Sequence, residues 1–384
     1  MAARRRREIA RRRRVVVLAL AGLAFLAGVA LGAGSGSGGG SGALPAGATA
    51  AERLAAKSRA DVDRLPLSRQ VGKLVVLRFN GTSEPRYVRD VLRRGRAAGA
   101  ILFHDNLTGP AQAKRLVAAL RRGAPVTPIV CVDQEGGGIR ILPWAPPQRT
   151  QAQQLAAGDV AAEARHAGQA LHDTGINVSL APVADVASVP GAALAGRAFS
   201  RDFGSTAIAI AQSVKGWEAG GVAPTVKHFP GLGGATTNTD FGPATITRTA
   251  AQLHEQDLLP FVAAIRAGVP LVMADHARYP ALDRSRIASQ SHRIVTGLLR
   301  GELGFTGVVM TDSTEAAAVQ AVSSVEVAAV RNLRAGVDIV LTTGRGSYIR
   351  AYRALLAQAR RDPAFRARVR ESAARVLALQ ATLK

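Results

Sequence analysis

Short runs of apolar residues recur along the chain from residue 75 onward, separated by stretches with helical periodicity. The eight runs are Val75–Phe79, Ala100–Phe103, Pro128–Asp133, Asn177–Pro182, Val222–Phe229, Pro270–Asp275, Gly307–Asp312 and Asp338–Thr342. Each run is too continuous for a strand with one face in water. This pattern is typical of parallel strands whose two faces are both covered.

Amphipathic segments between these runs predict helices. They are Tyr87–Arg96, Gln112–Arg122, Ala156–Thr174, Thr206–Ala219, Leu253–Ala267, His292–Glu302, Ser324–Ala335 and Ile349–Arg360. Glycines that include Gly99, Gly175 and Gly336 follow several of them, where helix C-caps are expected. Eight strand–helix alternations predict an α/β fold with one domain, a (β/α)8 TIM-type barrel. A doubly wound open sheet is the alternative, but no Gly-x-Gly-x-x-Gly follows an early strand.

A targeting segment is predicted before the barrel. Residues 1–14 form a basic flank with eight arginines, 15–33 are apolar, 34–54 form a Gly/Ser-rich linker, and 55–384 hold the barrel. A basic flank before such an apolar run predicts a transmembrane anchor with the arginines on the cytoplasmic side. A cleaved signal segment is the alternative. Both place the barrel outside the cytoplasm, either membrane-anchored or secreted after cleavage.

Composition narrows the range of partners. With 384 residues, 47% of them hydrophobic, the chain can bury a sizeable core. The formal net charge of +23 would suggest an anionic partner. Outside the N-terminal flank, however, the arginines are scattered and no basic patch is interleaved with aromatics, so we expect no nucleic-acid partner. The single cysteine, Cys131, lies in an apolar run, which excludes an internal disulfide.

Polar side chains stand at the ends of the predicted strands. They are Asp133, Asp185, Lys227, His228, Asp275, His276 and Asp312. Each alone is ordinary, because an Asp after a strand is often a helix N-cap. The C-terminal ends of barrel strands, however, form the active-site mouth. Together these residues predict a pocket with several fixed carboxylates and cations, as a polyhydroxylated ligand requires.

Compact motifs follow one another in a fixed order along the chain. They are Val132-Asp-Gln-Glu-Gly-Gly137, Gly175–Asp185, Gly196-Arg-Ala-Phe-Ser200, Thr225-Val-Lys-His-Phe-Pro-Gly-Leu-Gly-Gly234, Val272–His276, Leu299–Gly307 and Gly307-Val-Val-Met-Thr-Asp312. Together they resemble glycoside hydrolase family 3 over most of residues 65–320, with the single-domain β-N-acetylhexosaminidase branch as the nearest likeness. The resemblance implies a retaining glycosidase that releases terminal β-linked sugars from glycans or cell-wall fragments. N-acetylglucosamine is the first candidate for the released sugar. It implies no cofactor, and no metal-ligand cluster is evident.

The resemblance also implies roles for single residues. Asp312 corresponds to the nucleophile, and the sugar in the first subsite is held by Asp133, Arg197, Lys227 and His228. A retaining enzyme needs one ionised carboxylate to form the covalent glycosyl intermediate. A nearby Lys or Arg would favour that ionised form.

The sequence departs from this branch at the proton donor. The branch keeps a His, held by an Asp two residues earlier, in a mobile loop after Lys-His-Phe-Pro-Gly. Here Asn238 stands in place of the Asp and Asp240 in place of the His, and Gly138 replaces an Arg of the early loop. With these replacements a β-glucoside or another glycan is also a candidate substrate.

Three hypotheses fit this departure. In the first, Asp240 is the catalytic proton donor and forms a two-carboxylate pair with Asp312. In the second, another loop residue such as Glu315 serves as the proton donor, or the reaction is slow. In the third, the protein is a non-catalytic glycan-binding relative. A membrane-tethered scaffold with no ligand site is disfavoured by the strand-end residues.

Overall fold

Eight parallel strands form the centre of the computed structural model, which describes residues 47–383. They are β1 (Val75–Arg78), β2 (Gly99–Ile101), β3 (Ile129–Val132), β6 (Val178–Ser179), β7 (Ala223–Phe229), β8 (Leu271–Ala274), β11 (Val308–Thr311) and β12 (Val340–Leu341). Their hydrogen-bonded order is β11-β8-β7-β6-β3-β2-β1-β12. A parallel bridge between Met310 and Ile339 brings the two ends of this order together. The sheet is a nearly closed barrel, consistent with the predicted (β/α)8 fold.

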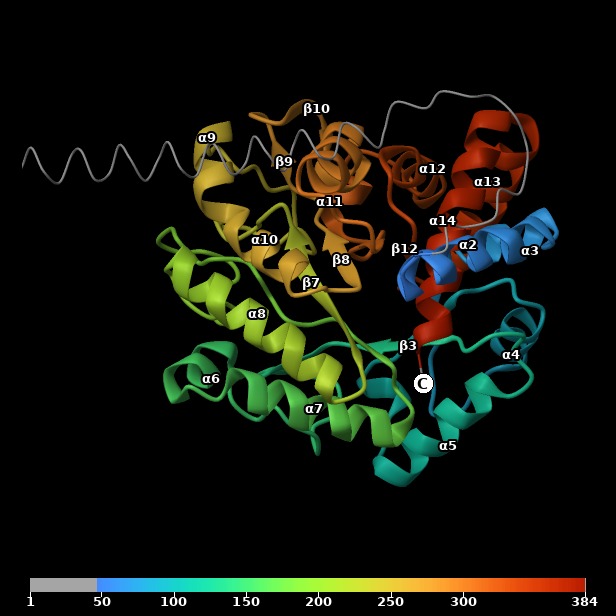
Figure 1. The fold of residues 1–384 in the computed structure, drawn as a ribbon, viewed down its shortest axis with the longest axis horizontal. Helices are drawn as coiled ribbons and strands as arrows, with labels where there is room; N and C mark the ends of the chain where they lie inside the picture. Colours follow the sequence, from blue (N-terminus) through green and yellow to red (C-terminus); the bar gives the residue numbers. More distant parts are fainter. Residues whose placement is uncertain (1–46, 384) are drawn as a thin grey trace, which may run out of the picture. The chain divides into compact units, whose positions relative to one another are not determined.

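Helices surround the strands on all sides (Figure 1). They are α4 (Arg86–Arg93), α5 (Pro110–Arg121), α6 (Gln151–Ala157), α7 (Val160–Thr174), α8 (Phe203–Ala219), α9 (Ala250–Gln252), α10 (Leu259–Arg266), α11 (Ala317–Gln320), α12 (Val325–Ala335) and α13 (Ser347–Arg361). Two π-helical segments, Leu253–Asp257 and Arg293–Glu302, lie where ordinary helices were predicted. The predicted helix 156–174 is two helices, because Gly158 adopts a left-handed conformation at φ 73° and ends α6.

Gly99 is not the helix cap that the sequence suggested. It begins β2, where a Cβ atom would come within 1.8 Å of the Ile129 carbonyl oxygen in the neighbouring strand. Gly175 and Gly336 do end helices in left-handed conformations, as predicted.

The C-terminal helix α14 (Pro363–Thr382) closes one end of the barrel. Its residues Val376 and Leu379 belong to the same buried cluster as inward-facing strand residues such as Cys131. The Gln380 side-chain amide donates to the carbonyl oxygen of Ala98, just before β2. The N-terminal ends of the strands are therefore covered, and the C-terminal ends are left for a site.

Most of the predicted N-terminal segments lie outside the described residues. This applies to the flank (1–14), the apolar segment (15–33) and the linker as far as residue 46. The last linker residues, from Ala50, already belong to helix α2 (Ala50–Asp63), which is followed by α3 (Leu67–Gly72). Within residues 47–383, no helix has both the length and the hydropathy to cross a bilayer.

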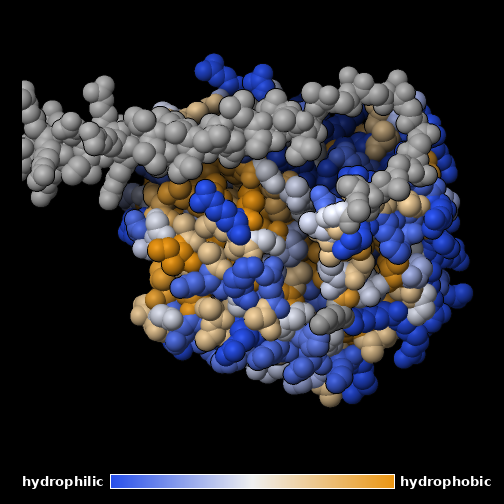
Figure 2. Space-filling view, in the orientation of Figure 1, coloured by the Kyte–Doolittle hydropathy of each residue, from blue (hydrophilic) through white to orange (hydrophobic). Residues whose placement is uncertain are grey.

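Apolar surface gathers over α8 and α10 on the face shown in Figure 2, where much of the remaining surface is hydrophilic. These helices carry two of the more exposed large apolar side chains, Ile208 and Leu259. Neither belongs to the cavity described below.

Candidate active site

A cavity of about 420 Å³ opens at the C-terminal ends of the barrel strands. It is lined by Arg78, Ile101, Phe103, Asp133, Glu135, Ile139, Ile141, Leu180, Arg197, Lys227, His228, Asp240, Met273, Asp312, Ser313, Leu341 and Thr343. The six residues to which the sequence analysis gave catalytic or sugar-binding roles, Asp133, Arg197, Lys227, His228, Asp240 and Asp312, are all in this set. They come from loops or strand ends of β3, β6, β7 and β11, so only the fold brings them together.

Strand β7 contributes two consecutive side chains to this one cavity. Neighbouring strand residues normally point to opposite faces of a sheet. Here the pairing of β7 with β8 is irregular between Val226 and Phe229, so the alternation is interrupted at Lys227 and His228. Both side chains are buried and both line the cavity.

A buried ionic network occupies one wall. The Lys227 ammonium lies 2.6 Å from Asp133 Oδ1 and 2.7 Å from Glu135 Oε1. Arg197 holds the same Glu135 through two parallel contacts of 2.6 and 2.9 Å. Burial alone would raise the pKa of Glu135, but Lys227 and Arg197 outweigh it and lower that pKa to about 2. Burial likewise opposes the charge on Lys227, yet Asp133 and Glu135 raise its pKa.

Glu135 was not singled out from the sequence, although it lies in the Asp-Gln-Glu-Gly-Gly motif. Its side chain is almost fully buried and sets the positions of two cations that face the cavity. The motif was the available signal. It could not reveal the role, because the partners Arg197 and Lys227 are remote in sequence.

His228 lies between two carboxylates. Its Nδ1 is 2.6 Å from Asp185 Oδ2, and its Nε2 is 3.8 Å from Asp312 Oδ2. Asp185 also accepts the backbone N–H of His228 at 3.1 Å, so it fixes both the ring and the chain. Asp185 is fully buried and outside the cavity lining, which makes it a support for His228.

Asp312 follows β11 and is held by local contacts. Its Oδ1 accepts the backbone N–H of Ser313 at 2.7 Å. Burial opposes ionisation of the Asp312 carboxyl, but neighbouring groups, His228 first among them and Lys227 also, outweigh it and lower the pKa. Asp312 is therefore a carboxylate at neutral pH.

Asp240 lies on the loop after β7, and its pKa is shifted in the opposite direction from that of Asp312. Its side chain is exposed at the cavity mouth, but the partial loss of surrounding water there and the negative charge of Asp312 raise its pKa. Its Oδ2 accepts the Asn238 side-chain amide at 3.2 Å, and its backbone carbonyl accepts the N–H of Ala317 at 3.2 Å. Because the carbonyl of Thr239 also accepts the N–H of Ala318 at 3.1 Å, the loop is docked on α11.

Two other strand-end candidates, Asp275 and His276, do not line the cavity. Asp275 accepts the Tyr279 hydroxyl, and burial raises its pKa well above the ordinary value. His276 contacts the Ser289 hydroxyl at 2.8 Å and the Ser313 carbonyl at 3.0 Å, and burial lowers its pKa. These side chains support the strand ends.

Glu315 is also committed elsewhere. Its Oε2 accepts the backbone N–H of Thr343 at 2.8 Å, the Thr343 hydroxyl at 3.0 Å and the Ser313 hydroxyl at 3.1 Å. Glu315 therefore fixes the loops after β11 and β12. Glu315 does not line the cavity and Asp240 does, so Asp240 is the better candidate for the proton donor.

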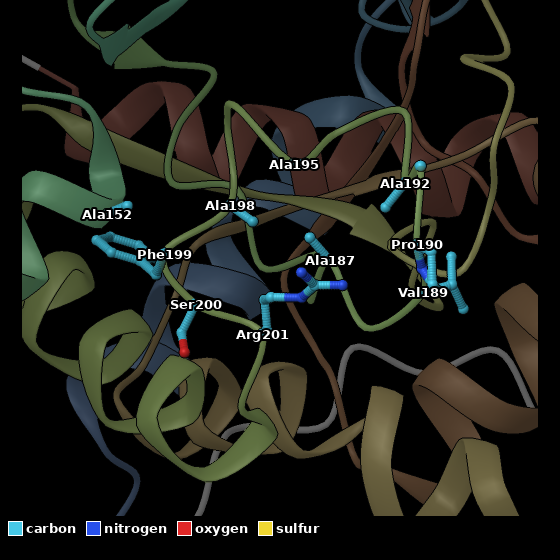
Figure 3. A pocket seen from close by; sticks show the side chains of 11 residues that line it. Ala152, Ala187, Val189, Pro190, Ala192, Ala195, Ala198, Phe199, Ser200 and Arg201 are labelled. Atoms are coloured by element: carbon cyan, nitrogen blue, oxygen red, sulfur yellow. The ribbon is translucent and has the colours of Figure 1, made fainter.

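A second, larger cavity of about 500 Å³ lies beside the segment 187–201 (Figure 3). Five of its eleven lining residues are alanine, and Arg201 is the only charged one among them. Without a carboxylate it lacks the groups for acid–base chemistry, so the candidate active site is the first cavity.

Comparison with known proteins agrees with this geometry. The family model "Glycosyl hydrolase family 3 N terminal domain" matches residues 67–379. The chain belongs to glycoside hydrolase family 3. As a member of this family it is a glycosidase.

Individual relatives are similar over most of the barrel. A "Beta-hexosaminidase" of Stenotrophomonas maltophilia (strain K279a) is 35% identical over 282 residues, which cover 70% of this chain and 82% of that protein. An "Uncharacterized secreted glycosyl hydrolase" of Arthroderma benhamiae is 34% identical over 306 residues, covering 74% and 84%. A family 3 β-N-acetylglucosaminidase structure from Paenibacillus sp. str. FPU-7 has 32% identity and a TM-score of 0.78. It matches 83% of this chain, which spans 62% of that chain.

Proposed function

We propose that the protein is a retaining glycosidase in which Asp312 is the nucleophile and Asp240 the general acid and base. One observation carries the proposal: the two carboxyl groups line one cavity and their pKa values are displaced in opposite directions. A pair of carboxyl groups separated in this way can supply one ionised and one protonated group at the same pH.

The two roles complete a balanced reaction. Asp312 attacks the anomeric carbon, while the Asp240 carboxylic acid gives its proton to the glycosidic oxygen as the bond to the leaving group breaks. The sugar is then esterified to Asp312. Asp240, now ionised, takes a proton from a water molecule, whose oxygen displaces Asp312 and releases the sugar with its original configuration.

The ionic network is the proposed sugar-binding wall. Lys227 has three N–H donors, of which Asp133 and Glu135 take two, so one is left for a hydroxyl of the sugar. Asp133 has its second oxygen available as an acceptor, and His228 and Arg197 reach the same cavity. These four side chains are the ones to which the family resemblance gives sugar-binding roles.

The proposed substrate is a glycan with a terminal β-linked N-acetylglucosamine. This is supported by the names of the relatives, a β-hexosaminidase and a β-N-acetylglucosaminidase. We further propose an extracytoplasmic location, membrane-anchored or secreted after cleavage. The basic flank and apolar segment of residues 1–33 support it, and the Arthroderma relative is described as secreted.

The test compares the wild type with Asp240→Asn on two substrates. A nitrophenyl β-N-acetylglucosaminide has a leaving group that departs without protonation, whereas the methyl glycoside requires it. We expect the variant to lose about 10²-fold or more of kcat on the methyl glycoside and much less on the nitrophenyl one. The alkaline limb of the pH profile should also disappear, because Asp240 must be protonated to act as the acid.

Two results would count against the proposal. An equal loss on both substrates would assign Asp240 a structural role. If the wild type hydrolysed neither substrate but bound N-acetylglucosamine, the protein would be a non-catalytic glycan-binding relative.

A further inference from the structure

Arginines that are scattered along the sequence are brought together on one side of the fold. Residues 1–46 contain eight of the 50 basic and one of the 27 acidic residues, so 42 basic and 26 acidic residues remain in the rest of the chain. Helix α13 contains four arginines, all of them exposed, and no acidic residue. Its outer face therefore carries positive charge alone.

Hydrogen bonds join α13 to the segments beside it. The Tyr352 hydroxyl donates to the Ser68 carbonyl of α3 at 3.0 Å. The Tyr348 hydroxyl donates to the Arg96 carbonyl, just after α4, at 2.6 Å. Helix α13, helix α3 and the end of α4 therefore form one continuous side of the barrel wall, on the right in Figure 1.

Arginines of the neighbouring segments extend the charge of α13 across this side. The Arg69 side chain lies against the turn after α4, because a Cβ atom built on Gly95 would be 3.7 Å from the Cδ of Arg69. We define the basic surface as the exposed side chains of Arg69, Arg96, Arg353 and Arg360. None of the four has an acidic partner within residues 47–383. Figure 2 shows that this side of the molecule is largely hydrophilic.

The chemistry of this surface fits an anionic lipid layer. Four cations without counter-charges repel one another, and an opposing layer of negative groups relieves that repulsion. Ile349 lies on the same outer face of α13, four residues before Arg353, and its side chain is 44% exposed. Basic residues beside an exposed apolar side chain suit the boundary between lipid headgroups and acyl chains. A phosphate backbone of a nucleic acid would leave Ile349 without an apolar partner.

The order of segments along the chain supports the same partner. The apolar segment that we predict to be a membrane anchor ends at residue 33, and α2 begins at Ala50. The 16 residues between them reach at most about 55 Å when fully extended. Helix α2 leads directly into α3, which contributes Arg69. None of the basic-surface residues lines the active-site cavity, so contact through them leaves its side chains uncovered.

We propose that the basic surface binds the anionic headgroups of a lipid bilayer, with Ile349 at the headgroup boundary. The barrel is then held against the bilayer by its wall, while its catalytic mouth stays open. This inference does not depend on the catalytic mechanism. Vesicle binding and glycosidase activity therefore test the two proposals separately.

The experiment uses the fragment of residues 47–384. Residues Ala50–Lys384 form a compact unit, and every buried hydrophobic cluster found in the described part of the chain lies within it, so we expect the fragment to fold. The fragment lacks the arginines and apolar run of residues 1–33, which would themselves bind lipid. Sedimentation should show binding to vesicles of mixed phosphatidylcholine and phosphatidylglycerol, weakening as salt is added, and little binding to phosphatidylcholine alone.

A triple variant tests the surface itself. Combining Arg69→Gln, Arg353→Gln and Arg360→Gln should lower the partition coefficient on the mixed vesicles by about 30- to 100-fold, the scale of three basic residues at an anionic membrane.

A second triple variant is the matched control, because it makes the same change in net charge elsewhere. It combines Arg165→Gln, Arg266→Gln and Arg293→Gln, which are exposed positions on α7, α10 and the π-helical segment Arg293–Glu302. Vesicle binding of this control should stay close to that of the wild type. All six substituted side chains are exposed, so both variants should keep the melting temperature and the activity of the wild type.

Three results would overturn the inference. Equal binding to vesicles with and without phosphatidylglycerol would show that negative headgroups are not the partner. Equal losses in the two triple variants would show that only net charge matters, not this surface. Tighter binding to duplex DNA than to the mixed vesicles at the same ionic strength, lost in the first triple variant, would assign the surface to a nucleic acid instead.

Discussion

The buried carboxylate of Glu135 should stabilise the fold as well as the site. Replacing it with Gln keeps the shape but removes the negative charge between Lys227 and Arg197. Lys227 would then keep its contact with Asp133 at 2.6 Å, whereas both carboxylate contacts of Arg197 would be replaced by contacts with a neutral amide. Removing one partner of a buried ionic network is costly, because the remaining charges stay buried without compensation.

The magnitude follows from the pKa. Glu135 has a pKa of about 2 in the folded protein, against an ordinary value of 4.5 that applies to the unfolded chain. The difference of about 2.5, at 1.36 kcal/mol per pKa unit, corresponds to about 3 kcal/mol of stability at neutral pH. Because the folded value is the lower one, this stability is fully present above pH 4.5. It declines below that and is lost as the pH falls through 2.

Urea unfolding of wild type and Glu135→Gln at several pH values measures this contribution. We expect a difference in the free energy of unfolding of about 3 kcal/mol at pH 7, shrinking to roughly 1.5 kcal/mol at pH 3. Glu218→Gln is the control, because Glu218 pairs with Lys215 on the surface and should contribute little. A difference below about 1 kcal/mol at pH 7, or one that does not shrink in acid, would refute the reasoning.

Asp312→Ala should lower kcat by several orders of magnitude while binding of N-acetylglucosamine persists, measured by activity and calorimetry; near-normal activity would exclude Asp312 as the nucleophile. Gly99→Ala should destabilise the barrel by about 3 kcal/mol or more, because the new methyl group would meet the Ile129 carbonyl at 1.8 Å. Thermal unfolding tests this, with Gly138→Ala as the control, where the added methyl group meets nothing within 4 Å. Equal melting temperatures for the two glycine variants would contradict the argument.

The strands were predictable because their sequence signal is local. Each predicted run starts within two residues of the first residue of the corresponding strand. This accuracy is possible because buried parallel strands are apolar throughout and are bounded by Gly, Pro or polar residues. Helix boundaries were less accurate. The break at Gly158 and the π-helical segment Arg293–Glu302 depend on how each turn packs, which periodicity does not encode.

The candidate site was predictable where family motifs contain its residues. The prediction was incomplete where tertiary contacts determine which way a side chain faces. The sequence placed Asp185, Asp275 and His276 at one edge with the cavity residues. The structure shows that these side chains are fully buried and face supporting partners instead: His228 for Asp185, the nearby Tyr279 for Asp275 and Ser289 for His276. Glu135 was overlooked for the same reason, since its partners come from β7 and from the loop after β6.

The replacements at positions 238 and 240 compensate each other, because the two new side chains can still form a hydrogen bond. In the Asp–His arrangement of the related branch, the Asp accepts a hydrogen bond that holds the proton-donating His. Here the Asn238 amide donates and the Asp240 carboxylate accepts, at 3.2 Å, so one hydrogen bond is kept with its direction reversed. A carboxylate retained at 238 would have placed a third negative charge beside Asp240 and Asp312. With a neutral amide there, the cationic wall and the Ser313 N–H favour ionisation of Asp312 first, and the resulting charge helps to keep the proton on Asp240. In the proposed mechanism, the surroundings of two chemically identical side chains therefore decide which is the nucleophile and which is the acid.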